Sequence, residues 1–123
     1  MSPASPEAAR ILLIEDDPAL TRALHDYLVY SGFRVATALN ADADADVDVI
    51  VSDYRLPGSL TGTEAIAALR VRAGRETPAI LLTGDIRGDA GHAAAQMNGV
   101  KLMLKPVRME ALVSEIRALL TVP

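Results

Sequence analysis

The segment VDVIVSDYRLPG, residues 47–58, is the stretch of the sequence that says most about the fold. Its first half is a short β-branched run with polar side chains only at Asp48 and Ser52, which is typical of a strand buried on both faces of a parallel sheet. The run leads directly into Asp53, and Pro57-Gly58 then breaks the chain. Open α/β sheets bind ligands at the carboxyl ends of their strands. Asp53 is therefore a candidate site residue, although a single aspartate more often only opens a turn.

Apolar runs and helical patterns alternate on both sides of this segment. Strands are predicted at 11–14, 33–38, 47–52, 78–82 and 100–104, and helices at 18–30, 63–72, 89–97 and 109–120. This alternation predicts a parallel sheet with helices on both faces. Right-handed crossovers restrict its topology to a few doubly wound arrangements.

Local signals refine two of these segments. Asp17 followed by Pro18 marks the start of the first helix, and Gly32 marks its end. Tyr27 and Tyr30, near the end of this helix, are expected to pack at the edge of the core. Residues 40–46, NADADAD, contain too few large apolar side chains to pack well, so we predict one or two helical turns at best, or a loop.

The composition limits the classes of protein. The chain has 123 residues, half of them hydrophobic, which fits one domain with a real core and argues against disorder. The absence of cysteine excludes disulfides, thiolate metal sites and a thiol nucleophile. The net charge of -4 and the scattered Lys and Arg leave no basic footprint for nucleic acid. No apolar run approaches the ~20 residues that span a bilayer, and the N-terminus has no signal-peptide core. We therefore expect a cytoplasmic domain at 10–121 behind a tail or linker at 1–9.

Charged and polar residues follow four of the five predicted strands. Glu15 and Asp16 follow the first strand, Asp53 the third, Thr83 the fourth and Lys105 the fifth. In a flavodoxin-like strand order, 2-1-3-4-5, the first and third strands flank the crevice where ligands bind, so the three carboxylates come close together. Two such charges ~4 Å apart repel by about 4 kcal/mol at an effective dielectric of ~20. A cation or raised pKa values must relieve this repulsion, and oxygen-only ligands at an open cleft suit Mg²⁺.

Four motifs carry a family resemblance. These are IEDDP at 14–18, DYRLPG at 53–58, LLTGD at 81–85 and LMLKPV at 102–107, each at the end of a predicted strand. In this order and spacing they resemble the receiver (phosphoacceptor) domain of two-component response regulators, over about residues 10–121. The resemblance implies the flavodoxin-like fold and a signalling module rather than an enzyme.

The resemblance also assigns roles to individual residues. Asp53 would accept a phosphoryl group from a phosphohistidine. Glu15 and Asp16 would hold Mg²⁺ with Asp53 and the backbone carbonyl of Arg55. Thr83 and Lys105 would bind the phosphoryl oxygens, and the peptide bond between Lys105 and Pro106 would be cis. These roles agree with the chemistry, because in-line phosphoryl transfer needs a positioned nucleophile and neutralisation of the charge on the phosphoryl oxygens.

The chain departs from the family pattern in three places. Leu102 occupies the position of the usual aromatic switch residue, three residues before the lysine. We therefore expect the usual switch not to operate: either signalling does not use an aromatic residue here, or the output surface differs. The segment between the second and third strands is short, so the second helix of the family should be stunted or missing, which would thin one face of the sheet and expose apolar surface for a partner. Arg55 and Asp85, at the mouth of the site, are expected to pair across it and to influence hydrolysis of the phosphoryl group.

The expected partners are a sensor histidine kinase or a histidine phosphotransfer protein, with a homodimer allowed and no direct contact with nucleic acid or membrane. The motifs LLTGD and LMLKPV resemble receivers fused to the C-terminus of hybrid sensor histidine kinases more than those of DNA-binding regulators. A receiver-like adaptor that is never phosphorylated is the alternative function. A haloacid dehalogenase-type hydrolase is disfavoured because the D-x-D pattern is absent after the first strand. The acidic residues there would also repel a mononucleotide or flavin phosphate.

Overall fold

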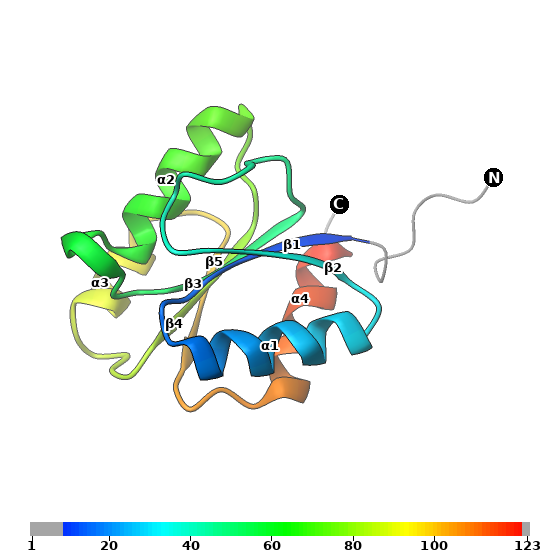
Figure 1. The fold of residues 1–123 in the computed structure, drawn as a ribbon. Coiled ribbons are helices and arrows are strands. Elements are labelled where there is room, and N and C mark those ends of the chain that lie inside the picture. The colour runs from blue at the N-terminus through cyan, green and yellow to red at the C-terminus, as the bar shows by residue number, and fades with distance from the viewer. Residues whose placement is uncertain (1–8, 122–123) are drawn as a thin grey trace.

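The computed structural model describes residues 9–121, so the predicted tail at 1–9 lies outside the described residues except for Ala9. Five strands form one parallel sheet in the order β2-β1-β3-β4-β5 (Figure 1). Their bounds are β1 Arg10–Ile14, β2 Arg34–Ala38, β3 Val49–Asp53, β4 Ala79–Thr83 and β5 Val100–Leu104. The predicted flavodoxin-like class and strand order are confirmed.

Helices cover both faces of the sheet. Their bounds are α1 Pro18–Tyr30, α2 Gly62–Ala73, α3 Asp89–Ala95 and α4 Met109–Leu120, with a short 3-10 turn, η2, at Pro57–Ser59. Helices α1 and α4 lie on one face and α2 and α3 on the other (Figure 1). Strand β1 contributes to both hydrophobic cores. Ile11 and Leu13 pack on the side of α1 and α4, and Leu12 and Ile14 pack on the side of α2 and α3. This arrangement explains why the central strands are apolar at successive positions.

The helix starts follow local capping rules. The side chain of Asp17 accepts hydrogen bonds from the N–H groups of Ala19 and Leu20, as its predicted role as N-cap requires. Helix α2 starts one residue earlier than predicted, because Thr61 and Glu64 form a reciprocal capping box around its first turn.

The segment 39–48 replaces a helix between β2 and β3. It contains no helical turn, so the prediction of a stunted or missing helix is confirmed, and the loop alternative holds for the NADADAD stretch. Its alanines are half-buried or buried against the α2–α3 layer, whereas Asp42, Asp44 and Asp46 are exposed. Side chains that alternate in this way indicate an extended segment lying along the core.

Arginines from elsewhere in the chain fasten this segment. The guanidinium of Arg72 donates to the carbonyls of Ala41 and Ala43, and Arg75 donates to the carbonyl of Val47. Val47 itself is buried, so the expected thinning of this face uncovers little apolar surface here, although Leu39 at the start of the segment is 57% exposed.

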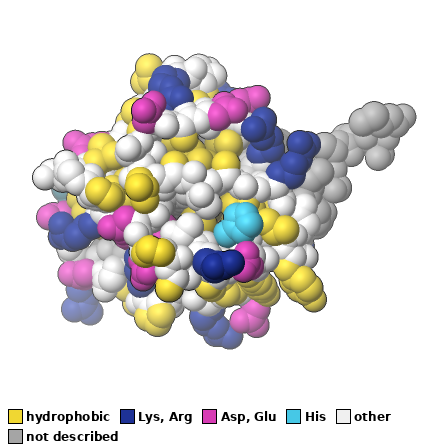
Figure 2. Space-filling view, in the orientation of Figure 1, with side chains coloured by type: hydrophobic (Ala, Val, Ile, Leu, Met, Phe, Trp, Pro, Cys, Tyr) yellow, Lys and Arg dark blue, Asp and Glu magenta, His cyan; other side chains and the backbone are white. Residues whose placement is uncertain are grey.

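The outer surface differs from one sequence expectation. Tyr27 is half-buried, but Tyr30 is 88% exposed, so its expected packing at the core edge is wrong. On the face shown in Figure 2, acidic, basic and apolar side chains are interspersed. No helix in residues 9–121 has both the length and the apolarity needed to cross a bilayer.

Candidate functional site

Three carboxylates meet where β1 and β3 end. Glu15 follows β1 and is buried, and its Oε1 accepts a hydrogen bond from the N–H of Asp17 at 3.2 Å. Asp16 is exposed, and Asp53 is half-buried at the end of β3. One oxygen from each of Glu15, Asp16 and Asp53 lies within 4.8 Å of the other two. Adjacent parallel strands bring these groups together, as the strand order required.

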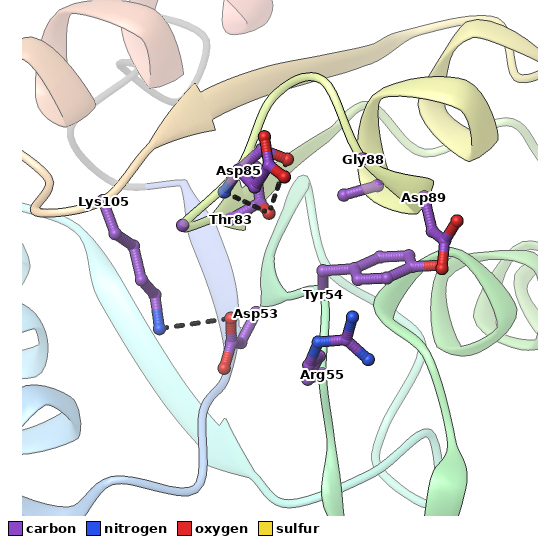
Figure 3. Close-up of a pocket in the computed structure, with 10 residues that line it drawn as sticks. Asp53, Tyr54, Arg55, Thr83, Asp85, Gly88, Asp89 and Lys105 are labelled. Atoms are coloured by element: carbon purple, nitrogen blue, oxygen red, sulfur yellow. Dashed lines mark hydrogen bonds and ion pairs between the residues drawn. The ribbon is translucent and has the colours of Figure 1, made fainter.

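Lys105 extends from the end of β5 into the same cluster. Its Nζ lies 3.1 Å from Oδ1 of Asp53 and 3.3 Å from Oε2 of Glu15. The backbone N–H of Lys105 donates to the carbonyl of Thr83 at 2.7 Å, which joins the ends of β4 and β5. The peptide bond to Pro106 is cis, as predicted. The lysine therefore bridges two carboxylates that come from different strands, and Figure 3 shows its contact with Asp53.

The electrostatics of the cluster follow from burial and charge. Burial raises the pKa of Glu15 above its ordinary value, the Asp17 N–H opposes this, and the charge of Asp53 raises the pKa further. Burial alone would lower the pKa of Lys105, but its hydrogen bonds and charge attraction to Asp53 and Glu15 raise it overall. The site thus holds more negative charge than one lysine neutralises.

The donor set of the cluster fits a hard divalent cation. All of its side-chain ligands are carboxylate oxygens, which Mg²⁺ prefers, and no thiol or imidazole belongs to the group. Two of the three carboxylates keep exposed surface, since the side chain of Asp53 is 13% exposed and Asp16 more so. An ion could therefore reach the cluster from solvent.

A cavity of about 370 Å³ opens beside Asp53. It is lined by Asp53, Tyr54, Arg55, Thr83, Gly84, Asp85, Gly88, Asp89, Ala90 and Lys105 (Figure 3). Four of the predicted site residues, Asp53, Arg55, Thr83 and Lys105, therefore share one cavity. Glu15 and Asp16 do not line this cavity but line a second one next to α1.

The hydroxyl of Thr83 is engaged by its own loop. Its Oγ1 accepts a hydrogen bond from the N–H of Asp85 at 3.2 Å and donates to the carbonyl of Asp85 at 3.3 Å. Thr83 is 7% exposed, so little of it faces solvent. The structure therefore places Thr83 in the cavity wall but without a hydrogen bond to Asp53 among the described residues.

The expected pairing of Arg55 with Asp85 is wrong. No ion pair joins them within residues 9–121; instead the guanidinium carbon of Arg55 lies 5.8 Å from the ring centroid of Tyr54. The carboxylate of Asp85 accepts from the N–H of Arg87 at 2.9 Å. Each side chain has a partner within its own loop, and these local contacts prevail over a contact across the cavity.

Some residues of the cavity were missed by reasoning from sequence. Tyr54, Gly88 and Asp89 contribute to the wall, and of these only Tyr54 directly follows a strand. The position of Tyr54 directly after Asp53 was the only signal that could have found it. Leu102 is half-buried in the α2–α3 layer and does not line the cavity, so the prediction about the usual switch remains a prediction.

Comparison with known proteins agrees with this geometry. The profile of the response regulator receiver domain matches residues 11–117. The C4-dicarboxylate transport transcriptional regulatory protein DctD of Pseudomonas aeruginosa is 37% identical over 99% of this chain and 28% of its own length. The uncharacterised transcriptional regulatory protein YkoG of Bacillus subtilis is 31% identical over 93% of this chain and 52% of its own length. The chain thus spans about half or less of these two curated relatives.

Solved structures share the fold. Chemotaxis protein CheY4 of Vibrio cholerae superposes with a TM-score of 0.81 at 23% identity, covering 91% of this chain and 98% of its own. The receiver domain of the sensor histidine kinase PA1611 of Pseudomonas aeruginosa has a TM-score of 0.80 at 26% identity, covering 94% and 99% of the two chains, and is described with a magnesium ion coordinated in its active-site cleft. The matched profile, the sheet order and the strand-end cluster agree, and the chain belongs to the receiver domain family of two-component response regulators.

Proposed function

We propose that this domain accepts a phosphoryl group on Asp53 from a phosphohistidine and signals by the conformational change that follows. One observation carries the proposal: the carboxylate of Asp53 contacts Lys105, lies next to two further carboxylates and opens into a cavity. A merely structural aspartate would have no need of the additional negative charges beside it. A domain that served only as an adaptor would not need a cluster in which like charges repel each other.

The cluster is suited to holding Mg²⁺. Glu15, Asp16 and Asp53 would provide carboxylate ligands, and the backbone carbonyl of Arg55 would complete the protein's share. When bound, the ion would neutralise negative charge on the phosphoryl oxygens. Support comes from the oxygen-only donor set and from the magnesium ion in the active-site cleft of the PA1611 receiver domain.

The residues of the chain would then act as follows. A carboxylate oxygen of Asp53 attacks phosphorus in line with the P–N bond of the donor. A P–O bond forms as the P–N bond breaks, and the electron pair stays with the imidazole nitrogen, which takes a proton from solvent. Lys105, already 3.1 Å from Asp53, would stabilise the charge on a phosphoryl oxygen. Its compact ammonium suits this enclosed position better than a planar guanidinium would.

Thr83 would supply the conformational response. Within residues 9–121, its hydroxyl makes two long hydrogen bonds, both within its own loop, at 3.2 and 3.3 Å. A phosphoryl group on Asp53 adds a charge of about -1.5 to -2 and strong acceptors nearby. Rotation of the hydroxyl toward these acceptors would release Asp85, and the loop between β4 and α3 would shift with it.

The partners and the whole protein are also matters of proposal. A sensor histidine kinase or histidine phosphotransfer protein would be the donor, in the cytoplasm, and the domain would touch neither nucleic acid nor membrane. The curated relatives described above are transcriptional regulators, whereas the PA1611 receiver comes from a sensor histidine kinase. Membership of a hybrid kinase therefore stays a prediction, as does a homodimer.

Intact mass spectrometry after incubation with acetyl phosphate tests the function. We expect the wild type to gain one phosphoryl group only with Mg²⁺, and Asp53→Ala to gain none. Asp42→Asn, which removes an exposed carboxylate from the segment 39–48, should behave as the wild type. If the folded wild type gains nothing from acetyl phosphate, the same experiment is done with a phosphohistidine-bearing phosphotransfer domain. Failure with both donors would overturn the proposal in favour of the adaptor.

A further inference from the structure

Gly62, the first residue of α2, is pressed against the end of β3. It is buried, and a Cβ built on it would overlap the backbone carbonyl oxygen of Asp53. The same Cβ would lie 2.6 Å from Cδ1 of Leu81 and 3.0 Å from Oγ of Ser52. Real Cβ atoms essentially never approach other atoms closer than 3.0 Å. Only glycine therefore fits here without movement of a neighbour.

Hydrogen bonds lock this contact in place. The N–H of Gly62 donates to the carbonyl of Tyr54 at 2.6 Å, and the N–H of Tyr54 donates to the carbonyl of Leu82 at 2.9 Å. The hydroxyl of Ser52 donates to the carbonyl of Asp53 at 2.9 Å. The backbone on both sides of Asp53 is thus held between β4 and the start of α2. A shift of that backbone would carry the carboxylate with it.

We infer that Gly62 is a positioning residue, whose missing side chain sets where the Asp53 carboxylate lies relative to Glu15, Asp16 and Lys105. The inference rests on the proposed function. The end of the Leu81 side chain can rotate away from a new methyl group, but the Asp53 carbonyl can move only with its strand. Because a carboxylate misplaced by ~1 Å costs about 100-fold in rate, a small backbone shift has a large effect.

The experiment compares Gly62→Ala with Gly91→Ala. Gly91 is the matched control, because a Cβ on this α3 residue would overlap the carbonyl oxygen of Ile86, and no atom of Asp53 is among its three nearest neighbours. Both variants should lose stability in urea. Only Gly62→Ala should weaken Mg²⁺ binding in calorimetry, by about 10-fold or more, and slow phosphorylation by acetyl phosphate by about 10- to 100-fold.

A rescue variant separates the two steric conflicts. Replacing Leu81 by Val within Gly62→Ala removes the side-chain conflict but leaves the one with the Asp53 carbonyl. We expect stability to recover in part and Mg²⁺ affinity not to recover. Full recovery of Mg²⁺ affinity would assign the defect to packing and overturn the inference, as would wild-type Mg²⁺ affinity in folded Gly62→Ala.

Two further measurements test the inference if Gly62→Ala does not fold or if the wild type does not bind Mg²⁺. If Gly62→Ala does not fold, Ser52→Ala removes the hydrogen bond to the Asp53 carbonyl without adding atoms. It should weaken Mg²⁺ binding a few-fold, and unchanged affinity would overturn the inference. If the wild type itself neither binds Mg²⁺ nor accepts phosphate, the proposed function fails. Positioning is then judged from NMR resonances of Asp53 and Lys105 in metal-free protein, which must shift in Gly62→Ala and not in Gly91→Ala.

Discussion

Replacing Glu15 with glutamine is expected to stabilise the domain when no divalent cation is present. Oε2 of Glu15 lies 3.3 Å from Nζ of Lys105, an attraction of about 5 kcal/mol at an effective dielectric of ~20. Asp16 and Asp53 lie within 4.8 Å, and each repels the same carboxylate by about 3.5 kcal/mol. The net repulsion is about 2 kcal/mol. Solvent screens the exposed Asp16, so we expect a gain of about 1 to 2 kcal/mol.

The raised pKa of Glu15 determines how the stability advantage of Glu15→Gln changes with pH. The pKa of Glu15 is raised in the fold above its ordinary value of 4.5, mainly by burial and by Asp53, so the native state holds this proton more tightly than the unfolded chain. Metal-free wild type therefore loses stability as the pH rises from 4.5 through the raised pKa. The side chain of Glu15→Gln does not ionise, so this variant does not lose stability over that pH range. Its advantage should vanish below pH 4.5 and be complete above the raised pKa.

Urea unfolding followed by circular dichroism, with and without Mg²⁺, measures both effects. At a concentration about 100 times its dissociation constant, Mg²⁺ should stabilise the wild type by about 2.7 kcal/mol. Glu15→Gln should gain much less, which reverses the order of stability. Asp17→Asn is the control, because it removes a nearby charge and keeps the N-cap hydrogen bond. Lower stability of metal-free Glu15→Gln at neutral pH would refute the reasoning, as would an undiminished response to Mg²⁺.

Two further predictions concern residues outside the strand-end cluster. The Oγ1 of Thr77 is buried without a hydrogen-bond partner among the described residues, so Thr77→Val should raise the free energy of unfolding by about 1 kcal/mol; an unchanged urea midpoint would mean that the hydroxyl is satisfied. Arg72→Met should lower the free energy of unfolding by about 1 to 2 kcal/mol, because it removes two hydrogen bonds that fasten the segment 39–48, and hydrogen exchange should increase there. Arg22→Met, at an exposed position of α1, should do neither.

The conformation of the segment 39–48 was only partly predictable from the sequence. The NADADAD stretch predicts a short helix or a loop, and the shortness of the segment correctly indicates that a helix is stunted or missing. Its alternation of alanine and aspartate also fits an extended segment with one apolar side. Arg72 and Arg75 hold it there from the end of α2, about 30 residues away. No local pattern reveals such a contact, because it depends on how α2 packs.

Within the site, position and orientation were predictable to different degrees. The strand-end residues could be placed because each follows an apolar run, and parallel strands end at one edge of the sheet. The hydroxyl direction of Thr83 and the partners of Arg55 and Asp85 could not be placed, because the sequence does not distinguish among the rotamers open to each side chain. The close approach of Gly62 to Asp53 was likewise invisible, since it involves no side chain at all.

By itself the sequence determined the alternation of strands and helices and which residues end each strand, because burial on both faces requires continuous apolar runs and helices require a 3.6-residue period. It also determined that three carboxylates and one lysine would gather at one edge. Only the tertiary structure decided that Lys105 bridges Asp53 and Glu15, that Thr83 turns toward its own loop and that α2 abuts the backbone of Asp53. Those outcomes depend on distances between elements far apart in the chain, which packing sets to within a fraction of an ångström.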